Sequence, residues 1–181
     1  MKFLFSLSLL LFLVNPTIVF DFNNDSDLSN WRIVDDGVMG GLSEGSFSIN
    51  ENGHGDFKGD ISLRNNGGFS SLRYYFPYMD VNENDIIILR VKGDGKPYEF
   101  RVKHDGQSYY SYVYSFVTSG EWEEIVIPLS EMSPAFRGRS LNIPDFNHDT
   151  ICELTILFGN KKPESFQLLV DKISISQFKD S

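Results

Sequence analysis

The sequence predicts an all-β protein, a sandwich or barrel of about ten short antiparallel strands. Short runs of alternating apolar and polar residues recur along the chain, and this period of two is typical of half-buried strands. Turn signals such as Asn52-Gly53 and Asp105-Gly106 separate these runs. Nine glycines lie between residues 31 and 73. They disfavour a helix there, because each glycine costs roughly 1 kcal/mol in a helix interior.

The size and composition of the chain indicate one globular domain. Of its 181 residues, 41% are hydrophobic and 14% aromatic, which is enough to bury a core without disulfides or metals. The net charge of −9 argues against nucleic acid as a partner, because phosphate backbones bind basic surfaces. Cys152 is the sole cysteine of the sequence, so no intrachain disulfide can form.

The chain begins with MKFLFSLSLLLFLV, in which one lysine precedes a continuous apolar run. This run is shorter than the roughly 20 residues of a membrane-spanning helix, and it matches a secretory signal peptide. We therefore expect a signal peptide over residues 1–16, although no A-x-A cleavage pattern follows it, and a single β-sandwich domain over residues 17–178. The expected location is a bacterial periplasm or the extracellular space. Membrane contact is expected only through an uncleaved leader.

Five strands are expected in the first part of the chain, each an apolar or alternating run bounded by turn residues. They cover residues 17–22, 31–34, 46–50, 56–63 and 69–76. A polar loop follows the first strand, and Asp36-Gly37 is expected to form a hairpin turn after the second. The third and fourth strands pair around Asn52-Gly53. The fifth begins after the turn sequence Asn-Asn-Gly-Gly at residues 65–68.

Further strands are expected after a loop over residues 77–85. They cover residues 86–92, 98–104, 108–117, 122–127, 151–158 and 166–175. The second and third of these form a hairpin around Asp105-Gly106. Residues 128–149 contain three prolines, so they are expected to form a long connection with no more than a helical turn near residues 129–132.

One candidate ligand face contains tyrosines that alternate along the strand at 108–117. Its expected members are Arg90, Arg101, Tyr110, Tyr112 and Tyr114. If the neighbouring strands lie beside this one, arginines and tyrosines share a sheet face. Such a face suits sugar stacking or a protein hot spot, because tyrosine combines an apolar ring with a polar tip. The alternative is that the tyrosines belong to the core and the arginines are solvated.

The loop after the first strand raises the question of a metal. Its alternating acidic and amide residues, from Asp21 to Asp27, resemble the start of a calcium loop. The glycine and glutamate that complete an EF-hand are missing, which excludes that motif. A structural calcium held by loop oxygens such as Asp21 with a distant carboxylate, Asp171, is one interpretation. The other is a solvated acidic loop.

The sequence contains no recognisable catalytic pattern. No serine lies in a G-x-S-x-G context, and the three histidines have no zinc-ligand spacing. Asp35 and Asp36 are adjacent, so on a strand they point to opposite faces and make a poor acid–base pair. The glycine-rich segments have no helix start behind them, which argues against a phosphate loop. We therefore expect no enzymatic activity.

Two glycine-rich blocks and the residues around them form the most specific pattern of the sequence. It consists of Trp31, Asp35, Asp36, Gly37, Val38, Met39, Gly40, Gly41, Asn66, Gly67, Gly68, Phe69 and Arg73. The pattern resembles that of the complex I intermediate-associated protein 30 family, and the resemblance extends over residues 19–175. It implies a galactose-binding-like jelly-roll sandwich without enzymatic activity. Mitochondrial members are assembly factors that hold intermediates of NADH:ubiquinone oxidoreductase, and related sandwich modules bind carbohydrate.

The pattern has two physical interpretations. Its glycines can shape adjoining loops into a structural clasp, with Arg73 paired to Asp35 or Asp36, or the same loops can form a binding surface. The leader is not arginine-rich as a mitochondrial transit peptide would be. The sequence therefore predicts an exported, non-enzymatic binding or assembly module that recognises a protein. The alternative is a carbohydrate-binding module that uses the tyrosine-rich face. The oligomeric state is left open.

Overall fold

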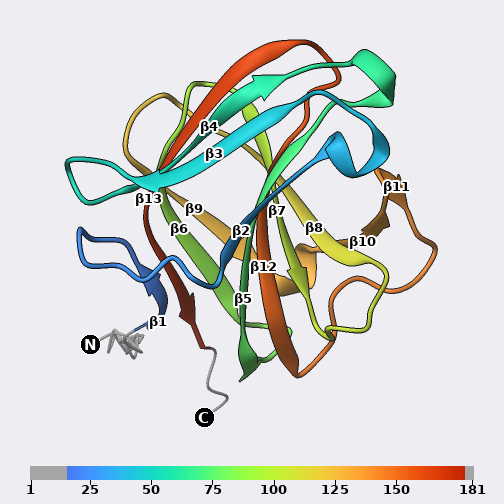
Figure 1. Cartoon of the computed structure of the whole chain (residues 1–181). Coiled ribbons are helices and arrows are strands. Elements are labelled where there is room, and N and C mark those ends of the chain that lie inside the picture. Colours follow the sequence, from blue (N-terminus) through green and yellow to red (C-terminus); the bar gives the residue numbers. More distant parts are fainter. Residues whose placement is uncertain (1–15, 178–181) are drawn as a thin grey trace, which may run out of the picture.

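The computed structural model describes residues 16–177 and consists of two antiparallel sheets packed into a jelly-roll sandwich (Figure 1). The six-stranded sheet contains, in spatial order, β3 (Glu44–Ile49), β4 (Gly55–Ile61), β13 (Glu164–Ser176), β6 (Ile86–Lys92) and β9 (Glu123–Pro128), with β1 (Thr17–Asp21) paired to β13. The seven-stranded sheet contains β11 (Arg139–Ser140), β10 (Ser133–Phe136), β8 (Ser111–Val117), β7 (Pro97–Lys103), β12 (Thr150–Phe158), β5 (Ser70–Asp80) and β2 (Trp31–Asp35). The predicted all-β fold is thereby confirmed.

Within residues 16–177, three short 3₁₀ helices lie in the connections between strands. They are η1 (Asp36–Met39), η2 (Arg64–Asn66) and η3 (Leu129–Glu131). The last agrees with the single helical turn expected within residues 128–149. That segment also contains β10 and β11, which the sequence did not predict because both are short and the first contains Pro134.

The hydrophobic core lies between the two sheets and follows the alternation of the strands. On β12, Leu154, Ile156 and Phe158 face inward, and register pairing aligns Ile156 with Phe100 on β7 and with Leu72 on β5. All of these side chains are buried. The outward residues of the same strand are polar or half-buried, which leaves a second face of the seven-stranded sheet available for function.

Two local predictions were wrong. The strand expected to end at residue 76 continues as β5 to Asp80, through Pro77. The pairing of β5 with β12 shifts between Ile151 and Glu153, so Pro77 lies in an irregular part of the ladder where its missing N–H is tolerated. Asp36-Gly37 does not form a hairpin turn but begins η1, because the Asp36 carboxylate is held by backbone groups of another loop.

The expected leader, residues 1–16, lies outside the described part of the chain except for Pro16. Among residues 16–177, no helix has the length and apolar character needed to cross a membrane.

Candidate functional site

The two glycine-rich blocks meet at the buried side chain of Asp36. One carboxylate oxygen accepts a hydrogen bond from the Ser43 backbone N–H at 3.0 Å, and the other accepts from the Ser43 hydroxyl. The second oxygen also accepts from the backbone N–H groups of Gly68 at 2.5 Å and Phe69 at 3.2 Å. Asp36 thus joins the loop after β2 to the loop before β5, which is the structural clasp that the pattern allowed.

The clasp leaves no space for side chains at two of its glycines. A Cβ on Gly41 would lie 2.1 Å from an oxygen of the Asp36 carboxylate. A Cβ on Gly67 would lie 2.6 Å from the other Asp36 oxygen and 2.7 Å from the carbonyl oxygen of Ser62. These close approaches explain why the pattern requires glycine at both positions.

Electrostatics favour the ionised form of Asp36 in the clasp. Burial raises the pKa of the carboxyl group, but the hydrogen bonds from Ser43, Gly68 and Phe69 together outweigh it and hold the pKa below its usual range. The negative charge is therefore part of the folded structure at neutral pH. This arrangement stabilises the loops and presents no carboxylate to a substrate.

Asp35 and Trp31 take structural positions beside the clasp. The Asp35 carboxylate accepts a hydrogen bond from the Gly45 backbone N–H at 3.1 Å, which ties β2 to β3. Trp31 is buried and stacks on Tyr74 with a centroid distance of 4.5 Å. The Asp35 Oδ1 and Trp31 Nε1 atoms have no hydrogen-bond partner among the described residues, but both are buried, so neither is accessible to a ligand.

Two leucines are exposed on the chain next to hydrogen-bonded serines of the clasp. The Ser43 hydroxyl accepts a hydrogen bond from the Ser62 backbone N–H at 3.1 Å. The chain neighbours of these serines, Leu42 and Leu63, are 47% and 41% exposed. Phe69 is half-buried in the same loop cluster. We call Leu42, Leu63 and Phe69 the loop-end patch; the side chains of Val38 and Met39 are outside what the structure describes.

Arg73 does not pair with Asp35 or Asp36, so this part of the clasp hypothesis was wrong. Arg73 lies on β5 and points to the outward face of the seven-stranded sheet. There its Nη1 atom lies 3.8 Å from Oε1 of Glu153 on β12. Sequence reasoning missed Glu153, because the register that brings β12 beside β5 depends on strands about 80 residues apart.

The tyrosine-rich ligand face was also wrong. Tyr112 is only 2% exposed and belongs to the core, and its hydroxyl contacts His148 Nε2 at 2.8 Å. Tyr110 and Tyr114 are partly buried and pack against the same core. Since they face inward and Arg101 faces outward, the pleat of the sheet separates the groups that were expected to act together.

The outward side of the seven-stranded sheet brings together polar residues from β5, β12 and β7. Thr155 at the centre is in register with Arg73 on one side and Arg101 on the other. Glu153 is in register with Tyr75 on β5. We call Arg73, Tyr75, Glu99, Arg101, Glu153 and Thr155 the outer polar face. It contains two of the predicted site residues, Arg73 and Arg101. Neither lies beside the partners predicted for it, which were Asp35 or Asp36 for Arg73 and the tyrosines of β8 for Arg101.

Arg90 lies on β6 in the other sheet, together with the expected calcium ligands. Its Nε atom is 3.1 Å from Asp171, and His54 Nδ1 is 3.2 Å from the other oxygen of that carboxylate. The Arg90 guanidinium also lies over the Trp122 ring at 5.7 Å. Asp21 lies 3.7 Å from the Lys172 ammonium. Residues 16–177 contain no group of three or more metal-ligating side chains, and these cations engage both expected calcium ligands.

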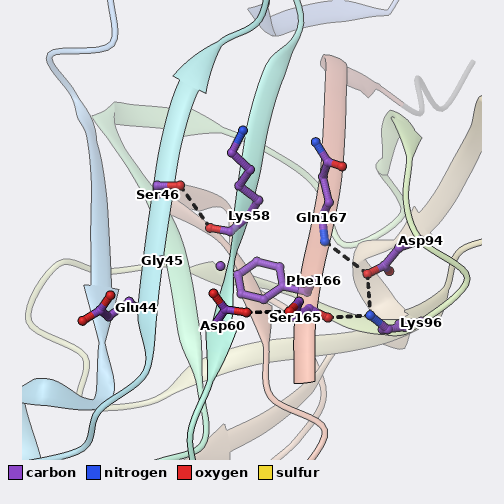
Figure 2. A pocket seen from close by; sticks show the side chains of 11 residues that line it. Glu44, Gly45, Ser46, Lys58, Asp60, Asp94, Lys96, Ser165, Phe166 and Gln167 are labelled. Carbon is purple, nitrogen blue, oxygen red and sulfur yellow. Dashed lines mark hydrogen bonds and ion pairs between the residues drawn. The ribbon is translucent and has the colours of Figure 1, made fainter. Parts of the chain in front are cut away.

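A shallow groove of about 620 Å³ crosses β3, β4 and β13 on the outside of the six-stranded sheet. Figure 2 shows that its polar groups bond mostly to one another: Ser165 donates to Asp60, and Lys96 contacts both Asp94 and the Ser165 carbonyl. Phe166, which lines the groove, is nearly buried. The groove therefore offers few free hydrogen-bonding groups and no stacking platform.

Comparison with known proteins identifies related sequences over nearly the whole domain. The family model described as Complex I intermediate-associated protein 30 matches residues 20–170. The mouse protein named "Complex I intermediate-associated protein 30, mitochondrial" is 25% identical, in a match that includes 87% of this chain and 55% of the relative. The chain thus spans about half the length of that curated relative.

The mouse relative corrects the expected location. Its mitochondrial name conflicts with export to a bacterial periplasm or to the extracellular space, so that expectation was wrong. The resemblance of the first fourteen residues to a secretory signal peptide had predicted export, but so short a pattern is weaker evidence than a match over residues 20–170.

Solved structures with the same fold include carbohydrate-binding modules. The family 11 module of the cellulosomal cellulase Lic26A-Cel5E from Clostridium thermocellum has a TM-score of 0.67 and 17% identity, with 93% of this chain and 98% of the module covered. A family 11 module from the same organism, in complex with a β-1,3-1,4-mixed-linked tetrasaccharide, has a TM-score of 0.66 and 18% identity, with 92% and 98% covered. At such low identity the likeness establishes the fold alone.

Proposed function

Because the chain belongs to the complex I intermediate-associated protein 30 family, we propose that it is a non-enzymatic binding module of the assembly-factor type. Its ligand in this proposal is a protein, as for the mouse relative, whose name associates it with intermediates of complex I. The observation that carries the proposal is the loop-end patch. Large apolar side chains exposed together are typical of protein-binding surfaces.

The rigidity of the clasp supports this role. Leu42 and Leu63 lie on loops that Asp36, Ser43 and Ser62 fix through one buried and two partly buried hydrogen bonds. A preorganised apolar surface loses little conformational entropy when a partner docks. The family pattern therefore contributes to binding indirectly, by holding the loops that present the leucines.

A co-precipitation experiment tests the proposal. The tagged full chain, directed to mitochondria of mouse cells that lack the relative, is expected to recover assembly intermediates of NADH:ubiquinone oxidoreductase on native gels. The double variant Leu42→Asp, Leu63→Asp places two charges in the patch and is expected to reduce that recovery by about tenfold or more, as for loss of interface hot spots. Val126→Asp, at a side chain exposed on β9 to a similar degree, is the matched control and should bind normally.

Equal recovery by the double variant and the unsubstituted chain would contradict a role for the loop-end patch. No recovery by a folded, unsubstituted chain would contradict assembly-type protein binding itself. Circular dichroism on each purified variant separates both results from simple unfolding.

Carbohydrate binding is the second candidate function. The tyrosine-rich face cannot serve it, because Tyr112 is in the core. The outer polar face favours it instead, since this face combines arginine, glutamate, threonine and an exposed tyrosine on a rigid sheet. The fold likeness to a module solved with a tetrasaccharide is consistent with this candidate.

A further inference from the structure

Three adjacent strands position the outer polar face. β12 lies between β5 and β7, as Figure 1 shows, and register pairing aligns Thr155 with both Arg73 and Arg101. Neighbouring strands are about 4.8 Å apart, so side chains one strand away lie within reach of a single small ligand. The face is therefore a fixed array of polar groups rather than a set of mobile loops.

Glu153 is the unusual group in this array. It is a carboxylate on the outward side of the sheet, yet it is only 7% exposed. Its Oε1 atom accepts a hydrogen bond from Thr155 at 3.2 Å. Its Oε2 atom receives no hydrogen bond from any residue between 16 and 177. An unpartnered Oε2 that keeps contact with solvent can accept a hydrogen bond from a ligand.

Arg73 supplies donors beside this acceptor. Its nearest contacts are long: 3.5 Å from Nε to the Ser71 hydroxyl and 3.8 Å from Nη1 to Glu153 Oε1. A guanidinium group carries five N–H donors, so most of those on Arg73 remain available. A free donor set next to a free acceptor matches the vicinal hydroxyl groups of a sugar ring, each of which both donates and accepts.

The charges of the face favour an uncharged ligand. Arg101 is already bound to Glu99, with Nε at 3.0 Å from Oε2, and Arg73 lies beside Glu153. Lys103 on β7 is in register with Glu153 and adds a third cation beside the face. Positive and negative groups thus lie close together there, in a chain whose net charge is −9. A polyanion would encounter both glutamates, whereas a neutral polyhydroxyl ligand can hydrogen-bond to groups of either sign.

Tyr75 adds an apolar surface at the edge of the array. It is in register with Glu153 and is 41% exposed. A tyrosine ring in this position can pack against the C–H face of a sugar while its hydroxyl stays in water. The ring and the acceptor lie in one register row and the donor lies in the next row on the same face, an arrangement that one pyranose unit can span.

We infer that the outer polar face binds a neutral oligosaccharide, with Arg73 donating to and Glu153 accepting from adjacent sugar hydroxyl groups and with Tyr75 packing on the ring. The inference rests on the second candidate function and specifies its site and ligand class. It is independent of the loop-end patch, which lies on other residues.

Titration calorimetry on the full chain tests this site. The probes are cellotetraose, laminaritetraose, mannotetraose and xylotetraose, with tetragalacturonate as the charged comparison. Saturable binding of at least one neutral tetrasaccharide is expected, with weaker or no binding of tetragalacturonate. Arg73→Gln and Glu153→Gln should each weaken binding by about tenfold or more, the loss expected when a hydrogen bond to a charged group is removed.

Arg139→Gln is the matched control, because Arg139 is exposed on β11 away from the face. It should bind as the unsubstituted chain does. Neutral binding that Arg73→Gln and Glu153→Gln leave unchanged would overturn the site while keeping carbohydrate binding. Preference for tetragalacturonate would overturn the ligand class. No binding of any probe by the folded chain would overturn both the inference and the second candidate function.

Discussion

Asp36 illustrates how a single buried side chain can hold together loops that are far apart in the sequence. Its hydrogen-bond donors come from residues 43, 68 and 69. The adjacent aspartates, the glycines and the serine were visible in the sequence, so the convergence of the two blocks could be anticipated. The partner of Arg73 could not, because only the register of β12 against β5 brings Glu153 to it.

Replacement of this carboxylate should destabilise the protein. In Asp36→Asn, the charge is lost and the amide group faces backbone N–H donors. The free energy of unfolding should fall by about 3 kcal/mol, because hydrogen bonds to charged groups contribute roughly 1.5–3 kcal/mol each. The melting temperature should fall by about 6–12 °C for a chain of this size. Asp25→Asn, in an exposed loop, is the control and should leave it unchanged. Thermal unfolding at pH 7 measures both.

The same variant has an expected pH dependence. The pKa of Asp36 is lower in the folded than in the unfolded protein, so its contribution to stability is complete above the unfolded value of about 4 and is lost as pH falls through the folded value. The difference in melting temperature between unsubstituted protein and Asp36→Asn should therefore shrink below about pH 4. A difference that stays constant down to pH 2 would argue against an ionised Asp36.

At the scale of elements, the alternation of apolar and polar residues predicted a strand well where the strands paired to it on both sides are regular. β6 has the predicted bounds, and the hairpin of β7 and β8 forms around Asp105-Gly106. Alternation failed to say which face of β8 is inside, because both faces carry residues that tolerate burial. Strand order decides that question, and strand order follows from packing of the whole sandwich rather than from any local pattern.

The orientation of β8 gives a direct prediction. Tyr112→Ala should lower the free energy of unfolding by about 3–5 kcal/mol, since it removes a buried aromatic side chain and leaves a cavity. Tyr109→Ala, at a residue that is 64% exposed just before the strand, should change stability by less than about 1 kcal/mol. Chemical denaturation of both variants measures the difference. Comparable losses from the two substitutions would mean that Tyr112 is not a core residue.

At the scale of the whole molecule, β13 occupies the middle of the six-stranded sheet. It pairs with β4 on one side and β6 on the other, and its far half also pairs with β1. A chain that ends at residue 163 would lack this strand and expose the edges of three others. We expect it to be unfolded by circular dichroism and to aggregate. A cooperative thermal transition in that truncated chain would contradict a central role for β13.

The central position of β13 also bears on biosynthesis. A ribosome releases residues 164–176 after every other strand of the sandwich, yet β1, β4 and β6 cannot be joined into one sheet without them. The nascent chain must therefore leave the exit tunnel with unpaired strand edges and wait for its last segment. During that interval a chaperone that shields strand edges would protect it, and the speed at which residues 164–176 are translated would set how long the exposure lasts.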